Sequence, residues 1–314
     1  MLRQRAARAV RWLAYATGAA VWNAKRTCRM RVLKFHGVGT GEYPPDLLEA
    51  QLRFLAEHFR LVPLLQIVET ARSGHPIRGD EVALTFDDGL RNNARVAAPL
   101  LARYGAPATF FVCPGLIERG AWLWNHEARE RLSSLAAERR RATLAAIGAP
   151  PSAIGEGDVE PAIEWMKTLP RAAREVAEGE IRAATPAFEP SAEQRQRFDI
   201  MTWSDLRQVD PTWITIGSHT VSHPILPTLG REELDYEVAE SRRWLEATLG
   251  RQIELFCYPN GAENERVRSA VAARYRAAVT TVPGSIRHGQ DPFSLPRIGI
   301  RLDLPQLAWE LQTT

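Results

Sequence analysis

Two adjacent carboxylates close a β-rich apolar run in the sequence EVALTFDDGL. Asp87 and Asp88 follow residues 81–86 directly, and Gly89 comes next. Neighbouring like charges repel each other, and a cation bound by one of them would offset that repulsion. Because consecutive strand residues face opposite ways, both carboxylates are useful only if the backbone turns here, and Gly89 permits such a turn.

A pair of histidines four residues apart ends a second β-rich run, TIGSHTVSHP. Gly217 before His219 and Pro224 after His223 indicate a compact loop or a single helical turn. That spacing puts two imidazoles on one side, which is the geometry a divalent metal needs from nitrogen ligands. Such a pair also occurs as simple packing, but a carboxylate at another strand end favours a metal site.

Two imidazoles and one carboxylate make a tripod with open coordination positions, as in catalytic zinc sites. Water admitted there has a pKa near 7 on zinc. One aspartate would bind the cation and its neighbour would stay ionised as a general base. The sequence therefore predicts a hydrolytic site that holds a divalent metal, with Zn²⁺ as the preferred ion.

The elements that must position these residues alternate along the chain between short β-rich runs and helical patterns. The predicted strands are RVLKFHGVG, EVALTF, PATFFV, TWITIGS, ELFCYP, AAVTTV and LPRIGIR. This alternation implies parallel strands, in a closed α/β barrel or an open doubly wound sheet. No GxGxxG or GxxxxGK[ST] motif follows a strand, so we prefer the barrel, whose strand ends share one mouth.

One segment, from about 115 to 198, has no convincing strand and is rich in alanine, arginine and glutamate. A structureless loop of that length is improbable in a compact domain, so we predict a helical insertion. The insertion follows a strand end, on the side where active-site loops lie. Trp124, near its start, either lines a substrate groove or pins the insertion to the barrel.

Composition excludes several classes of protein. The chain of 314 residues has 40 basic and 37 acidic residues, and no face is clearly basic, so we expect no nucleic-acid partner. Three cysteines without a CxxC pair indicate neither a disulfide framework nor a cysteine zinc site. Cys113 and Cys257, at strand ends, are expected to be small buried hydrophobes.

The N-terminal residues 1–30 form a basic and apolar segment. Its apolar run WLAYATGAAVW is too short to span a bilayer. Preceding arginines make it similar to a signal peptide, but Lys25 and Arg26 follow closely and would hinder export. The alternative is a helix lying on the domain or on an anionic membrane surface through Trp12, Tyr15 and Trp22. We expect a cytoplasmic or membrane-peripheral protein, with an extracytoplasmic one as the alternative.

Three motifs together resemble those of the polysaccharide deacetylases, also called carbohydrate esterase family four or the NodB-homology family. TFDDG at 85–89 and SHTVSH at 218–223 are similar to the first two motifs of the family, in the same order. FCYPNG at 256–261 resembles the FxYPxG form of the third. VLKFHGVG and LPRIGI resemble members with a long insertion. The resemblance covers essentially Arg31 to Arg301, least of all the insertion.

The resemblance implies a distorted (β/α) barrel of about seven parallel strands over residues 31–314, and removal of N-acetyl groups from a polysaccharide or glycan. It implies that Asp87 is the catalytic base. Asp88, His219 and His223 would be the metal ligands, and the backbone N–H near Tyr258 would donate to the oxyanion. The candidates for substrate contact are His36, Pro259, Asn260 and Trp124.

Two features depart from the family pattern. The late run SLPRIGI has Arg297 where the family has a histidine that acts as general acid, and the usual Asp–Trp motif is missing. His36, at the end of the first strand, and His288 remain as candidates for the acid, while His126 is undecided. A glycan-binding or scaffold protein on the same fold is therefore the alternative, and the intact set of two aspartates and two histidines argues against it.

Overall fold

The protein is described by a computed structural model that covers residues 2–41, 43–155, 157–300 and 303–314, with side chains from residue 5 onward. Arg301, where the resemblance to the family ends, lies outside the described residues.

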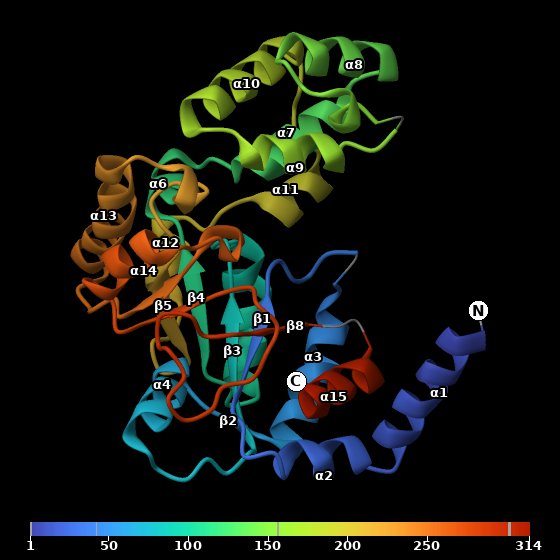
Figure 1. The fold of residues 1–314 in the computed structure, drawn as a ribbon, viewed down its shortest axis with the longest axis vertical. Coiled ribbons are helices and arrows are strands. Elements are labelled where there is room, and N and C mark those ends of the chain that lie inside the picture. The colour runs from blue at the N-terminus through green and yellow to red at the C-terminus, as the bar shows by residue number, and fades with distance from the viewer. Residues whose placement is uncertain (1, 42, 156, 301–302) are drawn as a thin grey trace.

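One sheet of parallel strands organises the chain (Figure 1). Seven strands follow the order β7-β6-β5-β4-β3-β1-β8, and β2 pairs with the first residues of β3. The sheet curls into a half-barrel, which confirms the predicted α/β fold of about seven parallel strands. The strands are β1 (Arg31–Phe35), β2 (Arg60–Leu61), β3 (Glu81–Phe86), β4 (Ala108–Val112), β5 (Ile214–Ser218), β6 (Leu255–Cys257), β7 (Ala277–Val279) and β8 (Ile298–Gly299).

The central strands are buried on both faces. All six residues of β3 and all five of β4 are buried, which explains why they read as nearly continuous apolar runs rather than alternating ones. Their register places Phe86 beside Phe35 of β1 and Phe110 of β4. The carboxyl ends of β1 and β3 therefore lie level with each other, and β4 runs two residues further to Val112.

Helices cover the sheet on both sides. The stretch NARVAAPLLARYG begins as a π-helical turn (Asn93–Ala97) before it continues as the α-helix α5. Pro99 explains the change, because it has no N–H to donate to the carbonyl of Arg95. The covering helices are α3 (Pro45–His58), α4 (Leu64–Ser73), α5 (Ala98–Arg103), α12 (Trp203–Gln208), α13 (Arg231–Leu249), α14 (Glu265–Ala272) and α15 (Leu304–Thr313).

The chain between β4 and β5, where the sequence predicts a helical insertion, folds as helices grouped at one end of the sheet (Figure 1). They bury an apolar cluster of their own, which includes Trp124, Leu132, Ile163 and Ile181. This second core explains how the segment is ordered without strands. The helices are α6 (Pro114–Arg119), α7 (Trp124–Ser134), α8 (Ala137–Ala146), α9 (Glu160–Thr168), α10 (Arg171–Ala184) and α11 (Ala192–Phe198).

The N-terminal segment forms two helices, α1 (Leu2–Ala16) and α2 (Ala19–Lys25), beside α15. Gly18, with a φ of 73°, turns the chain between them. Across the part of the chain that the structure describes, none of the helices has both the length and the apolar character needed to cross a membrane.

Candidate active site

The two adjacent carboxylates lie where the backbone turns sharply at the end of β3. Asp88 has a φ of 75° and Gly89 a φ of 67°. A side chain on Gly89 would stand 3.1 Å from Val112, so glycine is required for space as well as for conformation. This turn confirms the one predicted at Gly89. A non-glycine residue with positive φ is strained, and such strain concentrates at functional sites.

Asp87 is paired with a buried arginine. Arg297 donates from Nη1 to Oδ1 and from Nη2 to Oδ2, both at 2.7 Å. Burial acts to raise the pKa of Asp87, but the charge and hydrogen bonds of Arg297 outweigh it and hold that pKa at about 2. The guanidinium is itself fixed, because it also donates to Thr85 Oγ1 and to the carbonyl oxygen of Thr280. Asp87 is therefore ionised and held in one orientation.

Asp88 faces the two histidines instead. Its Oδ1 lies 3.5 Å from Nε2 of His219 and 3.5 Å from Nε2 of His223. All three side chains are buried. Burial acts to raise the pKa of Asp88, but the hydrogen bond from His219 and the charges of His36 and His223 hold it well below its usual value. The three predicted metal ligands are thus brought together, with one candidate ligand atom from each within 4.8 Å of the others.

The two rings differ in their surroundings. His219 Nδ1 lies 2.6 Å from the carbonyl oxygen of Cys257, which leaves Nε2 directed at Asp88. Burial and the neighbouring His219 lower the pKa of His223 to about 3, so this ring is neutral and its Nε2 can offer an electron pair. Anchoring one ring nitrogen so that the other faces a cation is the usual arrangement around metal ligands. The donor set fits a divalent cation.

The loop that carries the histidines is held by a buried glutamate. Glu237 of α13 accepts hydrogen bonds from the backbone N–H groups of Val221 and Ser222, at 2.8 and 2.9 Å. Its other oxygen accepts from Arg171 of α10 at 3.1 Å. His223 is fixed further by its backbone N–H, which donates to Thr220 Oγ1 at 2.9 Å. One carboxylate therefore connects the histidine loop, the sheet-covering helix and the insertion.

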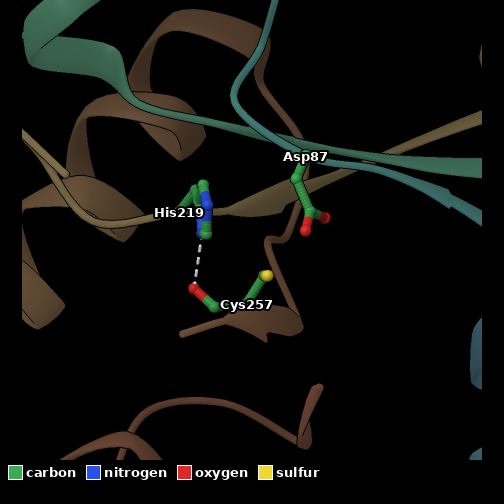
Figure 2. A group of neighbouring side chains, drawn as sticks. All are labelled: Asp87, His219 and Cys257. Carbon is green, nitrogen blue, oxygen red and sulfur yellow. Dashed lines mark hydrogen bonds between the residues drawn. The ribbon is translucent and has the colours of Figure 1, made fainter. Parts of the chain in front are cut away.

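A second group of side chains, Asp87, His219 and Cys257, also has atoms within metal-binding distance of one another (Figure 2). Arg297 occupies this place, since its Nη2 contacts both Asp87 and, at 3.3 Å, the sulfur of Cys257. A metal cation here would have to sit beside a buried guanidinium. The group around Asp88 is consequently the better metal site.

The third motif lies beside the site at the end of β6. Tyr258 is buried, and its backbone N–H donates to the carbonyl oxygen of Val279 at 3.3 Å. Its hydroxyl donates to Phe293. The N–H proposed as an oxyanion donor is therefore already used by the sheet. Pro259 is buried, whereas Asn260 is exposed and has a φ of 53°.

Two of the candidates for substrate contact lie in different settings. His36, directly after β1, is exposed and close enough to Asp87 and Asp88 for its charge to act on both. Trp124 is buried in the core of the insertion, where Arg174 stacks on its ring. It also lines a pocket of about 230 Å³ with Trp122 and other residues of the insertion. Trp124 therefore packs within the insertion itself, and its contact with substrate stays a prediction.

The insertion is joined to the site at both of its ends. At its start, the backbone N–H of Gly115 donates to the carbonyl of Val221 in the histidine loop. At its end, Ile200 forms an antiparallel bridge with Leu90, two residues beyond Asp88. The ring of His126, from α7, lies 4.6 Å from that of Phe198. His126 thereby comes within electrostatic reach of Asp88 and His223.

Three site residues were not assigned roles by the sequence. Arg297 is named there only for standing in place of a histidine, yet it is the partner of Asp87. Glu237 falls on the apolar stripe of its helix, and a glutamate at such a position is a detectable sign of a buried polar contact. The position of His126 could not be anticipated, because it depends on how the insertion folds back over the barrel.

Comparison with known proteins identifies the family. The family model described as Polysaccharide deacetylase matches residues 75–152 and 163–278, which is more than half of the chain. The chain therefore belongs to the polysaccharide deacetylase family, a family of hydrolases, and the resemblance seen in the sequence is confirmed. A curated relative, YxkH of Bacillus subtilis (strain 168), is provisionally named a polysaccharide deacetylase and is 28% identical over 101 residues. That match spans only 32% of this chain and 36% of YxkH.

Solved structures show that the fold is shared. The deacetylase PplD of Streptococcus pyogenes, solved in complex with acetate, superimposes with a TM-score of 0.62 at 19% identity, covering 91% of this chain and 99% of PplD. IcaB of Ammonifex degensii superimposes with a TM-score of 0.61 at 19% identity, covering 92% of this chain and 99% of IcaB.

Proposed function

We propose that this protein is a metal-dependent deacetylase that hydrolyses N-acetyl groups on a polysaccharide or oligosaccharide. The observation that carries the proposal is the position of Asp88 Oδ1, 3.5 Å from the Nε2 atoms of both His219 and His223, beside a second carboxylate that is paired with an arginine. Zn²⁺ is the ion that best suits two imidazoles and one carboxylate with an open position. Bound there, the cation supplies a Lewis acid to the substrate carbonyl and to the attacking water.

Asp87 is proposed as the general base. Arg297 keeps its carboxylate ionised and oriented through the paired hydrogen bonds, and each oxygen retains a further lone pair for a proton. A carboxylate with a pKa of about 2 is a weak base, so its contribution depends on position more than on basicity. Positioning is what the buried arginine provides.

His36 is proposed to protonate the departing amine. It is exposed at the mouth, and its charge reaches both aspartates. The competing candidate is His126. Burial lowers the pKa of His126 to about 4, so that ring is neutral near pH 7 and its remaining N–H is too weak an acid to protonate the amine. His288 lies in the loop before β8, and no contact supports a role for it.

The test is acetate release from a panel of N-acetylated oligosaccharides that differ in linkage, with O-acetylated sugars included. The protein is first treated with a chelator, and Zn²⁺, Co²⁺ or Mn²⁺ is then added back. We expect release to be lost on chelation and restored by one of these ions, with loss of N-acetyl groups seen by mass spectrometry. Glycan binding without any acetate release, with metal present, would contradict the proposal and support the scaffold alternative.

The proton donor is tested separately, with matched variants. His36→Gln should lower acetate release from a substrate with an amine leaving group by about 10²-fold or more. It should affect an activated ester less, because such a leaving group needs no proton. His126→Gln is the control and should leave the ratio of the amide rate to the ester rate unchanged. If His126→Gln lowered this ratio and His36→Gln did not, the proton donor would be His126 of the insertion.

A further inference from the structure

Helix α1 presents an apolar face to solvent. Ala6, Ala9, Val10 and Leu13 recur three and four residues apart, which places them on one side of the helix, and all four are exposed. Val10 and Leu13 are 53% and 58% exposed. On the opposite side Tyr15 packs on the body of the protein, with its ring 5.7 Å from that of Phe54. The helix is therefore anchored by one face while its apolar stripe stays uncovered.

Each of the two N-terminal helices also carries an exposed tryptophan. Trp12 is 60% exposed on α1, and Trp22 is 58% exposed on α2, where the guanidinium of Arg26 lies 4.2 Å from its ring centroid. Exposed tryptophans are unusual on a soluble surface but are enriched where protein meets the headgroup region of a bilayer. Figure 1 shows α1 at the edge of the molecule, far from the helices of the insertion.

The charge of this region is mostly positive, although Asp303, at the start of α15, lines one groove with Arg5, Arg8 and Trp12. The first acidic residue of the sequence is Glu42, while arginines and two lysines recur before it. Arg5 and Arg8 are exposed, and neither forms an ion pair with any residue that the structure describes. A second copy of the chain docking through α1 would bring arginines against arginines, which opposes association. An anionic lipid surface offers the complementary charge.

We propose that α1, together with the adjoining α2, binds peripherally to an anionic lipid bilayer. The stripe from Ala6 to Leu13 would enter the boundary between headgroups and acyl chains, with the ring of Trp12 beside it, and Arg5 at the flank of the stripe would meet lipid phosphates. The helix lies in the surface and does not cross it: its 15 residues span about 22 Å, less than the roughly 30 Å of hydrocarbon. This proposal is independent of the deacetylase activity.

The experiment is co-sedimentation of the full chain with vesicles of phosphatidylcholine alone or with added phosphatidylserine. We expect binding only to the anionic vesicles, and we expect it to fall when salt is raised from about 0.15 M to about 1 M. The double variant Val10→Gln, Leu13→Gln should bind about tenfold more weakly or worse. Glutamine keeps helix propensity, so the variant should melt at the same temperature as the parent.

A matched control removes equally exposed apolar side chains elsewhere. Val176 and Val282 are 66% and 58% exposed, and the double variant Val176→Gln, Val282→Gln should bind vesicles like the parent. Equal binding by the α1 variant and the parent would overturn the proposal. So would a dimer, seen by sedimentation velocity without lipid, that the α1 variant abolishes, because a second copy would then be the occupant. Acetate release from a soluble substrate should be the same for the parent and both double variants, which separates this test from that of the activity.

Discussion

Asp87 and Asp88 are neighbours in the chain, yet they lie in two pockets of different chemistry. Asp87 faces a guanidinium that cannot lose its proton, held at 2.7 Å on both oxygens. Asp88 faces two imidazoles 3.5 Å away, whose nitrogens can exchange a proton for a metal. The two side chains are identical, but the positive charge opposite Asp87 is permanent and the one opposite Asp88 can be replaced by a metal. This difference in their partners gives them different roles.

The largest effect is expected on the imidazole side. Asp88→Ala removes the only carboxylate between the two histidines, so tight binding of the divalent metal should be lost and acetate release should fall by about 10³-fold or more. Metal content by mass spectrometry and acetate release measure the two effects. Metal retained at full stoichiometry in this variant would contradict the assignment.

On the guanidinium side, Asp87→Asn should keep the metal and lose turnover by about 10²- to 10⁴-fold, because the amide cannot take up a proton. The same two measurements apply. Should both variants have the same metal content and the same activity, the division of roles between the pockets would be wrong.

The ion pair between Asp87 and Arg297 can be tested through the stability of the protein. Arg297→Met leaves Asp87 buried without a counter-charge and should lower the free energy of unfolding by about 3–5 kcal/mol. Adding Asp87→Leu should recover most of that loss, since no buried charge then remains. Both are read from denaturant unfolding of the metal-free protein, and a double variant as unstable as Arg297→Met would contradict the explanation.

The ion pair between Asp87 and Arg297 should also affect how the free energy of unfolding depends on pH in the acid range. The pKa of Asp87 is lowered to about 2 in the folded protein, so its contribution is complete above the unfolded value near 3.8 and is lost as pH falls through about 2. The loss amounts to about 2 kcal/mol. Asp87→Asn should lack this part of the pH dependence, measured by denaturant unfolding between pH 5 and pH 2, and an unchanged profile would argue against the pairing.

The smallest effect is expected at the sulfur between the pockets. Cys257→Ala should leave the metal content unchanged and alter acetate release by no more than about threefold, because the backbone carbonyl that anchors His219 is retained. Loss of the metal in this variant would instead favour the group formed by Asp87, His219 and Cys257.

Local sequence was sufficient for the parts of the site that lie on strand ends. The runs before Asp87 and His219 predicted buried parallel strands. Because parallel strands bring their carboxyl ends to one side, the three proposed ligands were expected to lie close together. The turn at Gly89 followed from the same argument. Cys113 and Cys257 are buried and free, as predicted.

What the sequence left open depends on contacts between distant segments. Arg297 meets Asp87 across 210 positions of sequence, and nothing in SLPRIGI indicates which carboxylate it will face. The backbone N–H of Tyr258 is consumed by Val279 because β6 and β7 pair there, which the motif alone does not indicate. The N-terminal segment was predicted to lie on the domain or on an anionic membrane surface, and only the packing of Tyr15 on Phe54 shows which face of α1 contacts the domain.

The contact between Glu237 and Arg171 bears on any attempt to trim the protein to its barrel. Deleting residues 115–198 would remove Arg171 and expose the Glu237 carboxylate, which is fully buried in the whole protein. That carboxylate also clamps Val221 and Ser222, so the histidine loop would loosen with it. The insertion therefore helps to hold the loop that carries His219 and His223, the proposed metal ligands, in place.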